Sequence, residues 1–287
     1  GKRVCLFFRN TCLSPSPALT LRVSSVLMKF GHCAQFEELS AVKDSGYDFT
    51  ELRGKAVAAL PEQDFESLCQ SLSDLELPCV GFNAYCSAEV VIAGPGYDRE
   101  NTKRYARHLA ARAKKLGIRQ VGIGSPASRT LPEGFDRDLA AAQMREFLLD
   151  SAECFALVNV RVALEPLAPF FCNFVNNYDE GMEYVAALSD NGIGLILDFL
   201  NMELSHEDDR DLRPLVPYVL HTHISDYDET PWHRDELKPA LYKVHQDRLR
   251  RLCDAGYDGT VSIETDLAYD RERAIQTLHA IKNLRLR

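Results

Sequence analysis

The chain has 287 residues, of which 46% are hydrophobic and 26% charged, so it is long enough and apolar enough to bury a core and is not a disordered chain. Its formal net charge is −9, with 33 Lys and Arg against 42 Asp and Glu. This balance disfavours a dedicated nucleic-acid binder, because such proteins usually carry a basic face. No stretch approaches 18 consecutive apolar residues, so no membrane partner is expected.

The nine cysteines are scattered and include no Cys-x-x-Cys pair. This pattern predicts reduced thiols rather than disulfides or a zinc knuckle, and therefore favours a cytoplasmic location. The first 27 residues hold basic residues and short apolar runs without a sustained signal-peptide core. We interpret residues 1–27 as an N-terminal extension that need not be native, and residues 28–287 as the folded domain.

From Met28 onward, short apolar segments alternate with amphipathic stretches. Most of the short segments are rich in β-branched, aromatic or glycine residues, and each is too short for a stable helix. The predicted strands are 28–33, 47–52, 78–84, 119–125, 159–166, 193–199, 218–225 and 259–265. The predicted helices are 35–45, 62–75, 98–117, 136–156, 178–190, 208–216, 234–255 and 269–285.

Eight strands, each followed by a helix, predict an α/β fold with a single (β/α)8 barrel. A doubly wound nucleotide-binding sheet normally has fewer units, and neither a Gly-x-Gly-x-x-Gly nor a phosphate-loop motif follows any predicted strand. No linker or break in composition divides the chain. In such barrels the active-site residues project from the carboxyl ends of the strands, so those ends are where we look for chemistry.

Ionisable residues end the last four predicted strands: Glu165, Asp198, His223 and Glu264. Any one of them alone could be a surface or loop-anchoring residue, but four on consecutive strands would meet at one mouth of the barrel. Three crowded carboxylates repel one another unless a cation neutralises them. Oxygen donors with one nitrogen suit Mn²⁺, Mg²⁺, Co²⁺ or Fe²⁺, and Zn²⁺ remains open. The pattern therefore favours a divalent metal site.

Four longer motifs surround these residues. They are Ala-Leu-Glu-Pro-Leu at 163–167, Ile-Leu-Asp-Phe-Leu-Asn-Met at 196–202, His-Thr-His-Ile-Ser-Asp at 221–226 and Gly-Tyr-Asp-Gly-Thr-Val-Ser-Ile-Glu at 256–264. In this order they resemble the xylose isomerase-like TIM barrel superfamily, and within it the sugar phosphate isomerase/epimerase group that includes ketose 3-epimerases. The resemblance spans about residues 28–285, and the order of the motifs is more specific than any one of them.

The resemblance implies a divalent ion, most often manganese, held by Glu165, Asp198, His223 and Glu264. It also implies that Glu165 and Glu264 exchange protons with the substrate. A metal that chelates a carbonyl and a neighbouring hydroxyl stabilises an enediolate, and a carboxylate on each face can remove and return the proton. The implied function is a metal-dependent isomerase or epimerase of a small carbohydrate or polyol-derived substrate, and a homo-oligomer remains open.

Three positions depart from the family's ketose epimerases. Phe171 replaces a Glu six residues after the metal-binding Glu, and Asn201 replaces a His three residues after the metal-binding Asp. Glu229 stands where an Arg is expected six residues after the ligand His. These changes leave the proposed metal ligands intact but alter the groups that would hold a free ketohexose, so the substrate stays undetermined.

Other polar or aromatic residues could hold the substrate. We predict contacts from Asn201, Asn173, Arg129, Trp232 and His221, although a supporting or packing role is favoured for His221. Further candidates at strand ends and in the following loops are His32, Glu51, Asn83, Asn176 and His233. Single polar residues in such loops more often satisfy the protein's own backbone than bind a ligand.

Three rival functions remain open at this point. A dehydratase of the inosose or dehydroshikimate type would use the same barrel and metal. A phosphodiesterase of the apurinic-site endonuclease branch would need a zinc cluster and more histidines than this mouth offers, and the charge of −9 opposes it. A non-catalytic sugar-binding relative would not need both Glu165 and Glu264.

Overall fold

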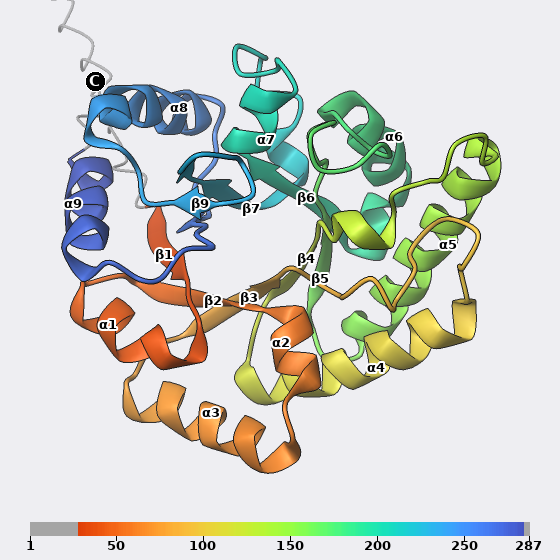
Figure 1. The fold of residues 1–287 in the computed structure, drawn as a ribbon, viewed down its shortest axis with the longest axis horizontal. Helices are drawn as coiled ribbons and strands as arrows, with labels where there is room; N and C mark the ends of the chain where they lie inside the picture. The colour runs from red at the N-terminus through yellow and green to blue at the C-terminus, as the bar shows by residue number, and fades with distance from the viewer. Residues whose placement is uncertain (1–27, 284–287) are drawn as a thin grey trace, which may run out of the picture.

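In the computed structural model, which describes residues 28–283, eight parallel strands close into a barrel in the order β1-β10-β7-β6-β5-β4-β3-β2 (Figure 1). Closure is made by β1 and β10, with Lys29 paired to Thr260 and His32 to Ile263. The predicted single (β/α)8 barrel is confirmed, and the extension 1–27 lies outside the described residues. The strands are β1 (Lys29–Cys33), β2 (Phe49–Arg53), β3 (Cys79–Asn83), β4 (Gln120–Ile123), β5 (Arg161–Leu164), β6 (Ile193–Asp198), β7 (Val219–Ile224) and β10 (Thr260–Ile263).

Helices surround the barrel and connect successive strands (Figure 1). Several begin at an aspartate whose side chain accepts hydrogen bonds from the first free backbone N–H groups, as Asp98, Asp136 and Asp270 do. They are α1 (Leu39–Asp44), α2 (Gly54–Ala59), α3 (Glu62–Asp74), α4 (Arg99–Leu116), α5 (Arg137–Ala156), α6 (Tyr178–Leu188), α7 (Phe199–Leu204), α8 (Tyr242–Asp254) and α9 (Arg271–Lys282). No described helix is long and apolar enough to cross a membrane.

The helix predicted over 208–216 is wrong. The helix after β6 is instead the short α7, which starts directly at the strand end and is capped by Asp198. Residues 205–215 form turns, because Pro214 and Pro217 interrupt a helix and the charged residues pair outward. Asp208, for example, accepts a hydrogen bond from Arg248 of α8 at 2.9 Å.

The helix predicted over 234–255 starts only at Tyr242. The preceding segment forms an antiparallel hairpin of β8 (Asp226–Tyr227) and β9 (Arg234–Asp235). Pro239 prevents an earlier helix start, and Asp226 accepts a hydrogen bond from the backbone N–H of Lys238 at 2.6 Å. This β8–β9 hairpin contributes side chains to the barrel mouth.

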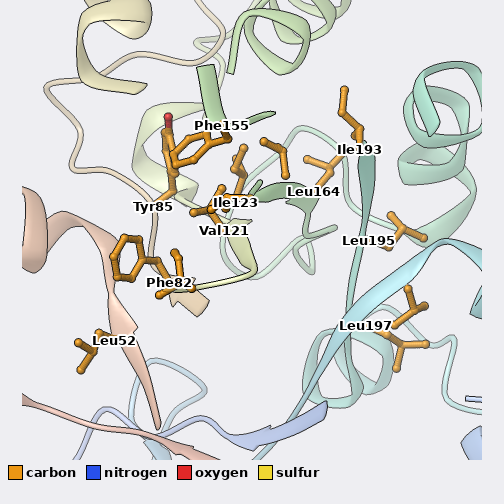
Figure 2. Packing of buried hydrophobic residues seen from close by; sticks show 14 of the residues in the cluster. Leu52, Phe82, Tyr85, Val121, Ile123, Phe155, Leu164, Ile193, Leu195 and Leu197 are labelled. Carbon is orange, nitrogen blue, oxygen red and sulfur yellow. The ribbon is translucent and has the colours of Figure 1, made fainter. Parts of the chain in front are cut away.

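Apolar residues at alternating strand positions pack between the barrel and its helices. Figure 2 shows Val121 and Ile123 of β4 beside Leu164 of β5, with Phe155 of α5 and Tyr85 close by. All five are fully buried. Because successive strand residues point to opposite faces, the positions between them face the barrel interior, which is where the ionisable strand-end residues lie.

Candidate metal centre

The strand-end residues of the second half of the barrel come together at one point. Glu165 follows β5, Asp198 ends β6, His223 lies in β7 and Glu264 follows β10. Each offers one ligand atom, and these atoms all lie within 4.8 Å of one another. Asp198 and His223 are fully buried, Glu165 is 5% exposed, and the Glu264 side chain is 14% exposed. The cluster therefore sits at the floor of the mouth, with one carboxylate partly open to solvent.

Amide side chains and backbone N–H groups fix the three carboxylates. Nδ2 of Asn201 donates to Oε1 of Glu165 at 3.2 Å and to Oδ2 of Asp198 at 3.1 Å. Nδ2 of Asn83 donates to Oε1 of Glu264 at 2.9 Å. The backbone N–H of Leu200 donates to Oδ1 of Asp198 at 2.7 Å, because the strand runs directly into α7. Such outer contacts hold metal-binding carboxylates in a fixed orientation.

His223 presents one nitrogen to the carboxylates and uses the other elsewhere. Its Nε2 lies 2.8 Å from Oε2 of Glu51, a buried residue of β2. Its Nδ1 has no hydrogen-bond partner among the described residues, and lies 3.5 Å from Oε2 of Glu264 and 3.8 Å from Oε1 of Glu165. A buried polar atom without a partner is costly. One imidazole nitrogen among three carboxylates fits a hard or borderline divalent cation.

Arg234 of β9 is a site residue that sequence reasoning missed. Its guanidinium lies 2.8 Å from Oδ2 of Asp198 and 3.1 Å from Oε2 of Glu264, and its Nη1 donates to Oγ of Ser225 at 3.0 Å. It stands eleven residues after His223, whereas the family pattern places an arginine six residues after, where this chain has Glu229. It reaches the mouth because β8 and β9 pair, with Tyr227 opposite Arg234, a tertiary pairing that no motif in the sequence marked.

The pKa values of the cluster reflect its burial and its surplus of carboxylates. Burial raises the pKa of Glu165 to about 7, and the charges of Glu264 and Asp198 add to this effect. Burial alone would raise the pKa of Asp198, but Arg234 and His223 hold it below its usual value. Burial would lower the pKa of His223, but Glu264 and Glu51 hold it well above its usual value. The site thus favours positive charge at its centre, as a cation site does.

A cavity of about 230 Å³ opens above the cluster. Glu165 and Glu264 line it on one side, and Phe171, Trp232 and Lys55 line it on others. The ring centroids of Phe171 and Trp232 lie 4.8 Å apart in an edge-to-face arrangement. Trp232, which was predicted to contact substrate, therefore lines the cavity, and Phe171 adds a second aromatic ring beside it.

Four other residues predicted to contact substrate serve the protein itself. Asn201 is in the site, but its amide holds Glu165 and Asp198 and accepts a hydrogen bond from the backbone N–H of Ala168. The remaining three do not line the cavity. Arg129 is fully buried and donates to the backbone oxygen of Glu165 at 2.7 Å.

Asn173 pairs with both backbone groups of Leu131, each at 2.8 Å, and so joins two loops. His221 is fully buried below the site, where its ring nitrogens contact Oγ1 of Thr260 and Oγ of Ser262. Of the further candidates, His32 contacts Glu236 at 2.7 Å, and Asn176 donates to backbone oxygens of its own loop. In each case the side chain forms hydrogen bonds with backbone groups or with other buried polar groups, which need such partners.

The fold and the ligand cluster together define a closed (β/α)8 barrel with an acidic, histidine-containing centre at the carboxyl ends of its strands. The family described as xylose isomerase-like TIM barrel matches residues 39–284, and the chain belongs to this family. No curated protein matches the sequence of the chain.

Several solved structures share the fold at low sequence identity. The 3-keto-D-glucoside 4-epimerase YcjR from E. coli is 17% identical, with a TM-score of 0.70 over 89% of this chain and 99% of that one. A D-psicose 3-epimerase from Clostridium cellulolyticum H10, solved with D-tagatose, is 17% identical, with a TM-score of 0.71 over 90% and 99%. IolI with a bound zinc atom is 18% identical, with a TM-score of 0.68 over 90% and 99%.

Proposed function

We propose that the chain is a divalent-metal-dependent isomerase or epimerase that moves a proton on a carbon next to a carbonyl of a small carbohydrate. The observation that carries the proposal is the convergence of Glu165, Asp198, His223 and Glu264 beside a cavity that Glu165 and Glu264 line, with the Nδ1 atom of His223 unpartnered among the described residues. The epimerases among the structures of similar fold support the same class of reaction.

Glu165 and Glu264 would carry the proton transfers. Both line the cavity from strands that are not neighbours in the barrel, so a bound sugar can lie between them. A carboxylate on each face of the sugar can accept a proton from the reacting carbon or return one to it. Asn201 and Asn83 would hold these two carboxylates in place. A divalent cation, Mn²⁺ in first place, would stabilise negative charge on the substrate oxygens when bound.

The cavity limits the substrate. Its volume of about 230 Å³ lies below the about 300–1,000 Å³ common for pockets that take drug-sized ligands, which favours a molecule of monosaccharide size. Phe171 and Trp232 offer ring faces and edges rather than charges, so they suit the C–H face of a sugar. Lys55 and Arg234 supply the positive charge of the lining.

The test is proton exchange with solvent. Metal-free protein, prepared by dialysis against a chelator, would be reloaded with Mn²⁺, Co²⁺ or Zn²⁺ and incubated in D₂O with a panel of ketoses, aldoses and inososes. We expect metal-dependent loss of one C–H signal in the proton NMR spectrum of the substrate. Exchange that survives without metal would contradict the metal requirement, and the growth of an enone absorbance would favour the dehydratase instead.

Variants test the two carboxylates. Glu264→Gln and Glu165→Gln should each abolish exchange, because the amide can neither take up the proton nor offer a charged ligand to the cation. Glu236→Gln is the matched control, since Glu236 is also buried and also contacts a buried histidine, His32, but does not line the cavity. Full exchange in Glu264→Gln would overturn its acid–base assignment.

A further inference from the structure

A second group of buried polar side chains lies directly behind His223. The register of β2 against β3 shifts between Thr50 and Glu51, and Glu51 is fully buried. Its Oε2 lies 2.8 Å from Nε2 of His223, 3.1 Å from Nε2 of His221 and 3.4 Å from Sγ of Cys33. Three potential donors thus surround a single carboxylate oxygen.

The contact between Glu51 and His223 determines which imidazole nitrogen is available to bind a cation. An ionised carboxylate only accepts hydrogen bonds, so Nε2 of His223 must carry the hydrogen. Three potential donors converge on Oε2 of Glu51, an arrangement that suits a carboxylate accepting hydrogen bonds. The other ring nitrogen, Nδ1, faces Glu165 and Glu264, and its lone pair is the one that a bound cation would use.

The contacts around Glu51 hold its carboxylate in a fixed position. His221, which also contacts Oε2 of Glu51, is itself held by Oγ1 of Thr260 at 2.6 Å and Oγ of Ser262 at 2.9 Å on the adjacent β10. All members of this group are buried or lie in the barrel wall. A carboxylate fixed from several sides fixes the ring that donates to it.

We propose that Glu51 is a positioning residue that sets the tautomer and orientation of His223, so that the divalent cation is bound through Nδ1. The inference rests on the proposed metal centre but not on the reaction or substrate proposed for it. A second metal among Cys33, Glu51 and His223 is the competing explanation of the same group. The 2.8 Å contact is a hydrogen-bond distance, which favours a shared proton over a shared ion.

Metal affinity is the first test. Mn²⁺ and Co²⁺ would be titrated calorimetrically into metal-free wild type, Glu51→Gln and Glu236→Gln. Glutamine keeps the volume of Glu51 but removes the charge and replaces one acceptor with a donor. We expect Kd to rise by about 10–100-fold in Glu51→Gln, the usual effect of losing the outer partner of a histidine ligand. Glu236→Gln, which alters an equivalent buried Glu–His contact with His32, should leave Kd unchanged. Equal Kd values in wild type and Glu51→Gln would overturn the proposal.

The bound nitrogen is the second test, and it needs no variant. Protein labelled with ¹⁵N at histidine and loaded with ¹¹³Cd²⁺ should show metal coupling to Nδ1 of His223 and a protonated Nε2. Coupling to Nε2, or two ions per chain with one lost in Glu51→Gln, would overturn the assignment. A chain that binds metal in this way yet exchanges no sugar proton would contradict the proposed function alone.

Discussion

Gly124 lies against the carboxylate of Glu165: a Cβ atom at position 124 would come within 2.6 Å of Oε2. Gly124 directly follows β4, and Glu165 directly follows the neighbouring β5. The backbone N–H of Glu165 also donates to the backbone oxygen of Ile123 at 3.0 Å, so the two strand ends cannot separate to relieve a clash. The position of Glu165 therefore depends on the absence of a side chain at 124.

Gly124→Ala should displace the Glu165 carboxylate and weaken metal binding and proton exchange. Overpacking a buried position costs about 1–3 kcal/mol of the free energy of unfolding, so a control of similar cost is required. Gly122→Ala in the same strand would place a Cβ 3.2 Å from Cγ1 of Ile196, below the site. Calorimetric metal titration and denaturant unfolding of both variants should show a loss of metal affinity only at position 124. An equal loss of metal affinity in both variants would mean that the cause is a general disturbance of the strand, not the displacement of Glu165.

The raised pKa of Glu165 predicts how the stability of the metal-free protein depends on pH. The folded protein holds this proton up to a pH of about 7, whereas an unperturbed glutamate releases it near 4.5. Between these values the folded state binds more protons than the unfolded state, so stability falls as pH rises. The contribution is fully present below about pH 4.5 and is lost as pH rises through about 7.

Glu165→Gln isolates this contribution, because glutamine is neutral throughout. The free energy of unfolding of the metal-free wild type, measured relative to metal-free Glu165→Gln by denaturant titration, should decrease from pH 4.5 to 7. Saturating Mn²⁺ should remove the decrease, because the cation stabilises the ionised carboxylate. A difference that stays constant over this range would contradict the buried, protonated state of Glu165.

Arg234 should contribute more to the stability of the metal-free protein than to that of the protein with a bound cation. Arg234→Met removes the guanidinium that pairs with both Asp198 and Glu264, and loss of one partner of a buried pair costs about 3 kcal/mol or more. We therefore expect added Mn²⁺ to raise the melting temperature of Arg234→Met more than that of wild type. Arg273→Met is the control, because Arg273 pairs with Asp235 of the same β9 strand but not with the site. Equal metal-induced shifts in all three proteins would contradict this interpretation.

Trp232 offers a direct reporter of ligand binding. It is the only tryptophan of the chain, it lines the cavity, and it is 51% exposed. A sugar bound against its ring should change the intrinsic fluorescence, and a titration should saturate only for sugars that also exchange deuterium. Trp232→Ala should raise KM by several-fold, corresponding to about 1 kcal/mol of aromatic contact. Phe170→Ala, at an exposed ring beside Trp232 that does not line the cavity, should leave KM unchanged.

The fold and the floor of the site could be predicted from the sequence because both depend on short-range patterns. Apolar runs mark the strands, and parallel strands in a barrel must bring Glu165, Asp198, His223 and Glu264 to one rim. The prediction of a helix over 208–216 was wrong because it gave more weight to the spacing of charged and apolar residues than to Pro214 and Pro217. Prolines that break a helix were the more reliable signal there.

The rest of the site depends on tertiary contacts that no local pattern records. Arg234 reaches Asp198 and Glu264 only because β8 and β9 pair. Arg129 and Asn173 could not be separated from ligand-binding residues by sequence, since the backbone oxygen of Glu165 and the backbone of Leu131 determine where they point. Glu51 was one candidate among several strand-end residues until its contact with His223 was known.

The two parts of the mouth have separate origins in the chain. The cluster of Glu165, Asp198, His223 and Glu264 comes from the barrel strands and the residues that directly follow them, whereas both Trp232 and Arg234 come from the β8–β9 hairpin. A hairpin of different length or sequence between Ser225 and Leu237 would change the wall of the cavity and remove the guanidinium that pairs with Asp198 and Glu264, while the four residues of the cluster would keep their places on the barrel strands. Variation in this one loop can therefore reshape the cavity wall without moving any residue of the cluster along the strands, and it changes the charge beside the cluster only through Arg234.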